Sequence, residues 1–162
     1  MKIFKLLIIG LNLVLLLFYF NHSVVEKEKL LKDGQLVLLE LAPVDPRSLM
    51  QGDYMALRYK IAGSIDTDSI AKRGYCVIKL DSNGVANKLR FQTALKPLNE
   101  GEYILSYRSS GYQAISFGAE AFFFQEGQAE KYGRAKYGAI KIDGKGNSLL
   151  IGLYDKHLRR IE

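Results

Sequence analysis

The chain has 162 residues, of which 48% are hydrophobic and 25% charged, and its formal net charge is +6 at pH 7. This length and composition are those of one globular domain and exclude a disordered or low-complexity chain. Cys76 is the only cysteine, which excludes an intramolecular disulfide and a cysteine-rich metal cluster.

The hydrophobic residues concentrate at the N-terminus. Between Ile3 and Phe20 the only strongly polar side chains are Lys5 and Asn12. A helix over this run is ~27 Å long, enough to cross the apolar core of a bilayer if the Lys5 ammonium group reaches the headgroups. The run is therefore either a membrane anchor or a signal peptide.

The residues after the run favour an uncleaved anchor. A cleaved signal needs small residues shortly beyond its apolar core, but the aromatic residues 18–20 occupy those positions. Aromatic side chains suit the far membrane interface, and Lys2 and Lys5 suit a cytoplasmic N-terminus. We therefore predict a signal anchor over residues 1–21 in the inner membrane, with lipid contacts along residues 3–20.

The remainder of the chain is then expected on the periplasmic or outer face. It carries a net charge of +4, and its basic and acidic residues alternate, which gives no support to nucleic-acid binding. The charged segment 22–34 ends in Asp33-Gly34, so we predict a helical stalk there. Residues 35–162 form the predicted exported domain.

The exported domain is predicted to be mainly β and mostly antiparallel, with one or two short helices. Eight short segments are rich in aromatic and β-branched residues and are bounded by turn residues, which is typical of strands. These segments are 35–41, 53–62, 74–80, 85–93, 102–108, 112–118, 136–142 and 148–154. Residues 125–135 are predicted to contain a short helix, and Cys76 is predicted to be a buried, unreactive strand residue.

Two hairpin turns are predicted where Asp, Asn and Gly separate apolar runs, at Asp81–Gly84 and Asp143–Asn147. Neither loop continues with the alternating oxygen ligands and distal Glu of a calcium loop. His22 and His157 are not clustered with other ligands, so both are predicted to be surface residues. We expect no metal or cofactor.

The segment "PVDPRSLMQGDYMALRY", residues 43–59, combines a stiff loop with the start of a strand. Pro46 forces the preceding Asp45 into an extended conformation, and the Asp45 carboxylate can accept hydrogen bonds from loop amides or pair with Arg47. Farther on, polar and apolar residues alternate. This alternation predicts a core-facing set that is Met55, Leu57, Tyr59 and Ile61.

The same segment resembles the GDYXXLXY family. The matching motif residues are Gly52, Asp53, Tyr54, Leu57 and Tyr59. The upstream "PVDPRSL", with Asp45, Pro46 and Arg47, and the downstream "AFFFQEG", with Glu126 and Gly127, are also similar to the family pattern. The resemblance covers roughly residues 36–155. It implies a membrane-anchored, exported domain encoded beside a multi-pass membrane protein, and it brings no catalytic residues.

Two functional hypotheses follow. The first is a non-enzymatic binding or accessory module for the neighbouring multi-pass membrane protein. The second is a hydrolase, or an inert relative, on a signal-peptidase-like scaffold, because Pro46, Leu49 and Gly52-Asp53 are similar to residues near the nucleophile of those enzymes. Pro43 stands at the nucleophile position and has no hydroxyl, and the lysine base such an enzyme needs is not singled out between Lys60 and Lys79. A cleft gathering Asp45, Arg47, Asp53 and Glu126 around a hydroxyl or ammonium would favour the hydrolase.

Overall fold

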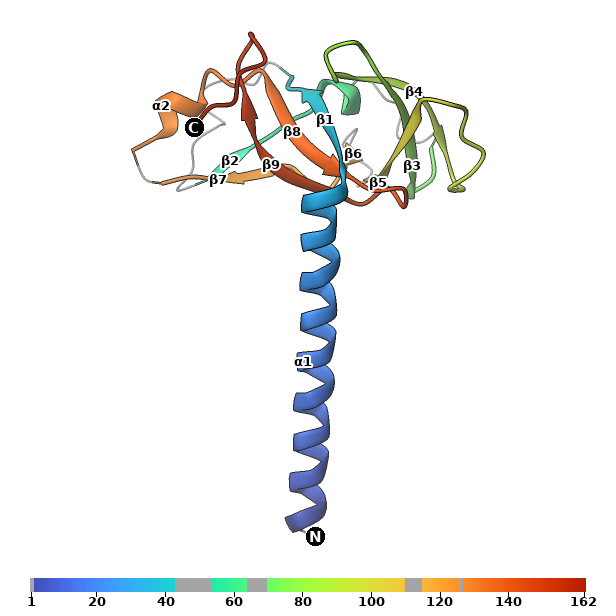
Figure 1. Cartoon of the computed structure of the whole chain (residues 1–162), viewed down its shortest axis with the longest axis vertical. Helices are drawn as coiled ribbons and strands as arrows, with labels where there is room; N and C mark the ends of the chain where they lie inside the picture. Colours follow the sequence, from blue (N-terminus) through green and yellow to red (C-terminus); the bar gives the residue numbers. More distant parts are fainter. Residues whose placement is uncertain (1, 43–53, 64–69, 110–114, 126) are drawn as a thin grey trace.

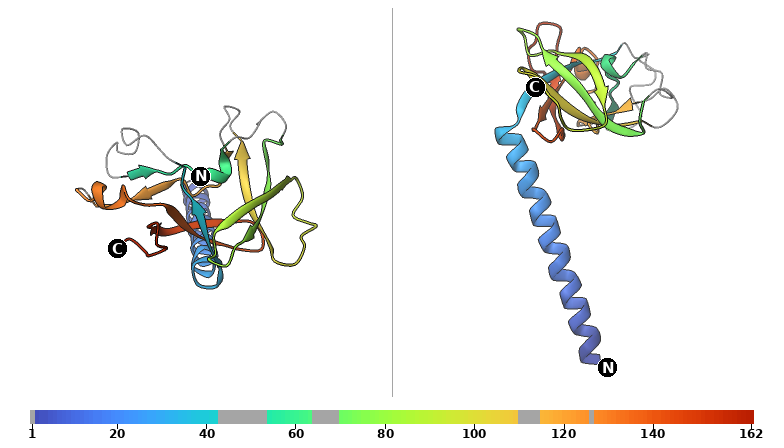
Figure 2. Two further views of the ribbon diagram at one scale, coloured as in Figure 1. Left: turned by 90° about the horizontal axis from the view of Figure 1, so that it is seen from above. Right: turned by 90° about the vertical axis from the view of Figure 1, so that its right-hand side faces the viewer.

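A single long helix carries the rest of the molecule. The computed structural model describes residues 2–42, 54–63, 70–109, 115–125 and 127–162. Helix α1, Lys2–Asp33, is unbroken and is long and apolar enough to cross a membrane. Figure 1 shows it extending from a β-rich head, and Figure 2 shows that it joins the head near one side. No break marks the predicted boundary between anchor and stalk.

The head is mainly β and antiparallel, as predicted. Its strands are β1 (Gln35–Glu40), β2 (Tyr54–Ala56), β3 (Arg73–Leu80), β4 (Ala86–Gln92), β5 (Glu102–Ser109), β6 (Ile115–Ser116), β7 (Ala121–Phe123), β8 (Tyr137–Ile142) and β9 (Ser148–Tyr154). A 3-10 turn at Lys60–Ala62 and the short helix α2, Ala129–Tyr132, complete the elements of the described residues.

The strands form three sheets. One sheet has the order β1-β8-β9, a second has the order β4-β3-β5-β6, and β2 pairs with β7 alone. Figure 1 shows β1, β8 and β9 above the end of α1, with β2 and β7 to one side and β3, β4 and β5 to the other. The first two sheets meet where the Leu38 amide donates to the Gly84 carbonyl at 2.9 Å.

One apolar core joins the sheets. Its completely buried members come from both of the larger sheets, and they are Val37, Leu39, Cys76, Ile78, Leu105, Ile140 and Leu153. Several strands are buried on both faces, because Leu38 and Val77 point away from these residues and are still no more than 5% exposed. Cys76 is buried as predicted, and burial raises the pKa of its thiol to about 12.

Both predicted hairpin turns are present and use the same local geometry. In each turn the Asp carboxylate accepts hydrogen bonds from the amides two and four residues later, at 2.8–2.9 Å from Asp81 and at 2.9 Å from Asp143. The residue three positions after the Asp has a positive φ, +77° at Gly84 and +86° at Gly146. Glycine meets that requirement without steric cost.

A third loop repeats this geometry at the C-terminus without a glycine. The Asp155 carboxylate accepts from the amides of His157 and Arg159 at 2.8 and 3.0 Å. The residue three positions after Asp155 is Leu158, whose φ is +59°. A leucine is disfavoured in this region of φ, which is why the sequence "DKHLR" did not predict the turn.

The predicted strand 53–62 is wrong in length, although its burial pattern is confirmed. Only Tyr54–Ala56 forms a ladder with β7, and the Leu57 amide extends this pairing by one bond to the Glu120 carbonyl. The backbone then changes partner, because the Arg58 carbonyl accepts from the Ala42 amide. The apolar residues at alternate positions 55, 57, 59 and 61 are nevertheless all buried. Alternation therefore identifies the buried face even where the ladder ends.

Two further predicted elements are seen only in part or are shorter than expected. Of segment 112–118, only Ile115–Ser116 forms a described strand, because residues 110–114 lie outside the described part. Of segment 125–135, only Ala129–Tyr132 is helical. Gly127 precedes that helix with a φ of +82°, a conformation that interrupts a helix and limits its length.

Candidate functional site

The structure describes only part of the predicted motif. Asp45, Pro46, Arg47, Gly52, Asp53 and Glu126 lie outside the described residues, so the cleft proposed to gather four of them stays a prediction. The backbone of Tyr54 begins β2, and Leu57 and Tyr59 are buried in the core. Leu57 and Tyr59 therefore act as packing residues of the motif.

Tyr59 locks the motif to two other parts of the head. Its hydroxyl donates to the Ala119 carbonyl, and its ring meets the ring of Phe117 edge to face at 6.3 Å. A Cβ on Gly138 of β8 would lie 2.9 Å from Tyr59 Cε1, so the ring occupies the space that a side chain on β8 would take. Burial and the nearby Glu120 raise the pKa of the phenol, which keeps it a neutral donor.

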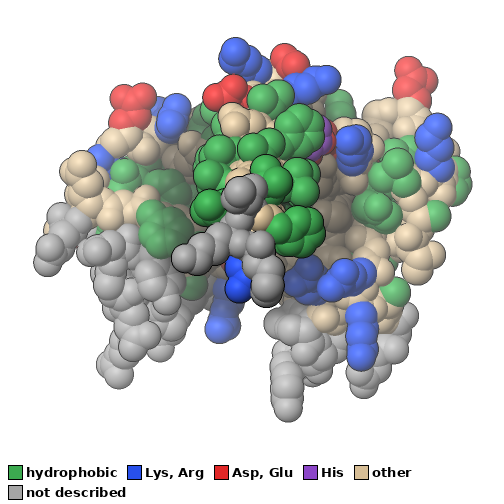
Figure 3. Space-filling model, turned by 90° about the horizontal axis from the view of Figure 1, so that it is seen from below, with side chains coloured by type: hydrophobic (Ala, Val, Ile, Leu, Met, Phe, Trp, Pro, Cys, Tyr) green, Lys and Arg blue, Asp and Glu red, His purple; other side chains and the backbone are tan. Residues whose placement is uncertain are grey.

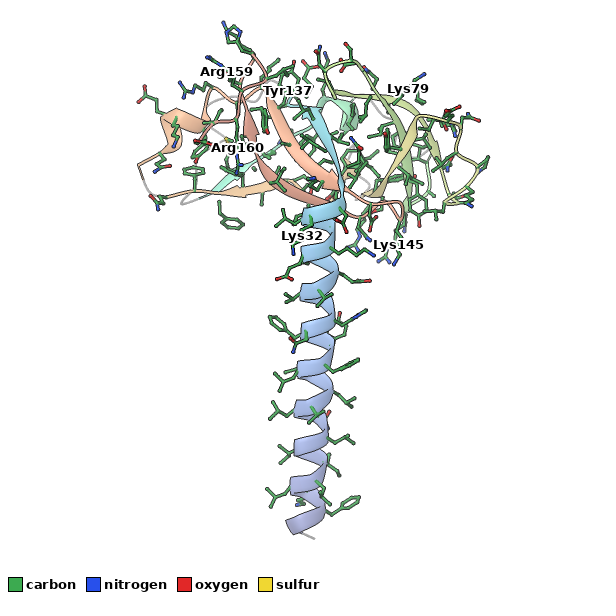
Figure 4. All side chains as sticks on the ribbon, viewed as in Figure 1. Lys32, Lys79, Tyr137, Lys145, Arg159 and Arg160 are labelled. Carbon is green, nitrogen blue, oxygen red and sulfur yellow. The ribbon has the colours of Figure 1, made fainter. Side chains whose placement is uncertain are left out.

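A groove lies where α1 meets the head, and we call it the stalk groove. It has a volume of about 950 Å³. Its helix wall includes Glu26, Lys29 and Leu30, and its head wall includes Tyr103 and the hairpin Asp143–Asn147. Figure 4 shows Lys145 of this hairpin on the underside of the head beside the upper end of α1. Sequence analysis missed the groove because its helix wall and its head wall are far apart in the sequence.

Contacts at the top of the groove fix the helix to the head. Leu30 is 8% exposed although it lies on α1, and the Gly34 amide donates to its carbonyl at 3.0 Å. The Lys141 ammonium group donates to the Gly34 carbonyl at 2.8 Å. A Cβ on Gly34 would lie 2.4 Å from the Leu30 oxygen, so this turn from helix to strand requires glycine.

The groove itself carries mixed charge. Lys145 lies 3.9 Å from the Glu26 carboxylate across it, an exposed ion pair that adds little to stability. Burial opposes ionisation of Asp143, but hydrogen bonds from Asn147 and from the Lys145 amide hold the pKa of that carboxyl below its ordinary value. The groove therefore presents charged groups of both signs to an approaching molecule.

The lysines considered for a hydrolase are solvent-exposed. Lys60 pairs with Glu40 at 3.2 Å, and Lys79 is exposed near the end of β3. Figure 4 shows Lys79 on the side of the head turned away from α1. A Ser/Lys nucleophile pair requires a desolvated lysine, so neither residue supports that chemistry. His22 and His157 are exposed, as predicted.

The fold and groove together define a class of protein: an antiparallel β head carried on one N-terminal helix that is long and apolar enough to cross a membrane. Comparison with protein families identifies it further. The chain belongs to the GDYXXLXY protein family, whose model matches residues 16–153. Neither curated proteins nor solved structures give a match.

Proposed function

We propose that this protein is a membrane-anchored, exported, non-enzymatic accessory module that binds a multi-pass membrane protein through the stalk groove. The supporting observation is the position of the groove, which is formed by α1 and by the face of the head turned toward the N-terminal apolar segment. A partner embedded in the same membrane would approach the head from that side.

The length of the helix supports this arrangement. Gly34 follows the last residue of the apolar run, Phe20, by a helical rise of ~21 Å. The headgroup layer accounts for ~5–7 Å of that rise. If α1 stands upright, the head is then ~15 Å above the headgroups, within reach of the extramembrane loops of a neighbouring protein.

Site-specific photo-crosslinking in cells tests this proposal. A photoreactive amino acid is placed at Lys29 in the groove, and the matched control carries it at Lys79 on the opposite side of the head. We expect Lys29 to crosslink to a multi-pass membrane protein and Lys79 to give no such product. Equal crosslinking from both positions, or none from Lys29, would refute the groove as the binding surface.

A separate experiment tests the orientation. We expect alkaline phosphatase fused after Glu162 to be active and the intact mass to include residues 1–21, because the aromatic residues 18–20 replace a cleavage site. An inactive fusion would place the head in the cytoplasm. A mature N-terminus after residue 20 would remove the anchor.

A further inference from the structure

Two arginines face each other across neighbouring strands. Arg73 at the start of β3 is the register partner of Arg108 near the end of β5, and both side chains are exposed. Directly opposite residues of an antiparallel pair have Cβ atoms ~4.5–5.5 Å apart, and like charges at that distance are destabilising. The sheet therefore holds two positive charges together at an energetic cost.

Some other cations of the head are paired with carboxylates. These ion pairs are Lys60 and Lys136 with Glu40, Arg90 with Glu102, and Arg159 with Asp155. Within the described part of the chain, neither Arg73 nor Arg108 lies within 4.0 Å of a carboxylate. Unlike those paired cations, Arg73 and Arg108 have no counter-ion among the described residues.

The two arginines line a cleft of about 540 Å³. Its described walls contain no Asp or Glu. They include the hydroxyl group of Thr93 and, on the opposite face of the sheet from the arginines, that of Tyr107. Glu120 is the acid of the adjoining turn, but its carboxylate already accepts from Ser116 Oγ at 2.8 Å and from the Gly118 amide at 3.0 Å. Two guanidinium groups therefore face one nearby carboxylate, which leaves the cleft with a net positive charge.

Tyr107 lies over a glycine in this cleft. A Cβ on Gly74 would lie 3.0 Å from the Tyr107 hydroxyl, so a side chain at position 74 would displace the phenol. Burial, followed by the proximity of Cys76, raises the pKa of Tyr107, which keeps the phenol protonated and able to donate.

We propose that Arg73 and Arg108 form an anion site that binds the phosphate group of an organic ligand. Guanidinium groups suit phosphate because their planar forks donate paired hydrogen bonds to it. One guanidinium fork already engages both oxygens of a carboxylate, whereas the three terminal oxygens of a phosphate monoester can accept from two forks that approach from neighbouring strands. The cleft volume leaves room for the organic part of the ligand.

The ligand has two available sources. The cleft shares Ser106, Phe117 and Gly118 with the stalk groove, so it opens near the α1 side of the head. Figure 3, viewed along α1, shows Lys and Arg side chains on this face beside the helix. The phosphate can therefore belong to a soluble organic phosphate or to a lipid headgroup. This site does not depend on the proposed protein partner.

Two binding measurements on the full chain test the site and separate the sources. The first is titration calorimetry in non-ionic detergent with glycerol phosphate, and with acetate at matched ionic strength. The second is hydrogen exchange at β3 and β5 in nanodiscs of phosphatidylcholine with or without phosphatidic acid, whose headgroup is a phosphate monoester. The test variant is Arg73→Gln/Arg108→Gln. The matched control is Arg58→Gln/Arg134→Gln, which removes the same charge at two exposed arginines outside the cleft.

We expect the test variant to weaken glycerol phosphate binding by at least ~10-fold, equivalent to ~1.4 kcal/mol, and the control to leave it unchanged. If binding of glycerol phosphate is absent and protection requires phosphatidic acid, the ligand is a lipid headgroup. That result supports the site if the test variant loses the protection and the control keeps it. The proposal is overturned if acetate binds as tightly as glycerol phosphate, if both variants lose binding equally, or if neither ligand source gives a signal.

Discussion

Replacing Gly138 with alanine tests the packing of the family motif. The new Cβ would lie 2.9 Å from Tyr59 Cε1 and 3.2 Å from its hydroxyl oxygen, whereas ordinary contacts are 3.4–4 Å. The ring would have to move by several tenths of an ångström. It has little room to do so, because it is 3% exposed, its hydroxyl is bonded to Ala119, and β8 is paired on both sides.

Overpacking of a buried site typically costs ~1–3 kcal/mol, and we expect Gly138→Ala to lower the free energy of unfolding by that amount. This is a large fraction of the ~5–15 kcal/mol that stabilises an ordinary domain. Urea unfolding of the full chain in non-ionic detergent gives the free energy. Near-ultraviolet circular dichroism follows the tyrosines, and nine of the ten lie outside the apolar N-terminal run.

Two further variants make the interpretation specific. Gly144→Ala is the control, because a Cβ there has no atom within 4 Å, and we expect a change of no more than ~0.5 kcal/mol. In a Tyr59→Leu background the ring edge is absent, so Gly138→Ala should cost less, with a coupling energy of ~0.5–3 kcal/mol. Equal effects of Gly138→Ala and Gly144→Ala, or an unchanged cost in the Tyr59→Leu background, would refute the proposed contact.

Three other outcomes are expected. A bidentate hydrogen bond from Arg90, followed by the bond from the Asn99 amide, lowers the pKa of Glu102 to about 2. The stability that this carboxylate adds is complete above its unfolded pKa near 4.5 and is lost as pH falls toward 2. Glu102→Gln should therefore flatten the acid unfolding curve over that window, and an unchanged curve would contradict this. Cys76 should resist a water-soluble maleimide in the native protein and react in urea, because burial keeps its thiol protonated. Rapid labelling of the native protein would contradict this burial and show that the strand opens. Leu158→Asn should raise the free energy of unfolding by ~0.5–1 kcal/mol and Leu158→Val should lower it, because asparagine tolerates the positive φ and a β-branched residue does not. The opposite order of stabilities in urea unfolding would rule out backbone strain at this position.

The sequence predicts features that depend on neighbouring residues. The two Asp–Gly hairpins are determined locally, because the carboxylate and the glycine that close each turn are only three residues apart. The loop at Asp155 obeys the same rule, yet Leu158 replaces the glycine that would have identified it. Alternation likewise located the buried face around Tyr59 without giving the length of the strand.

Features that depend on distant pairing were not predictable. The length of β2 is set by how far β7 runs beside it, and the opposition of Arg73 and Arg108 depends on the register of β3 and β5. No local pattern encodes that register. The stalk groove requires the end of α1 and a hairpin more than a hundred residues later to meet, so only the assembled fold contains it.

The unbroken helix α1 also has a rotational consequence. An α-helix turns by ~100° for each residue, so the apolar segment and the head are held at a fixed angular phase as well as a fixed height. Inserting one residue after Phe20 would swing the stalk groove about a quarter of the way around the helix axis. Inserting seven would restore its direction to within ~20° while lifting it by ~10 Å. The number of residues between the apolar run and the head therefore sets the direction in which the stalk groove opens, and each added or removed residue changes that direction.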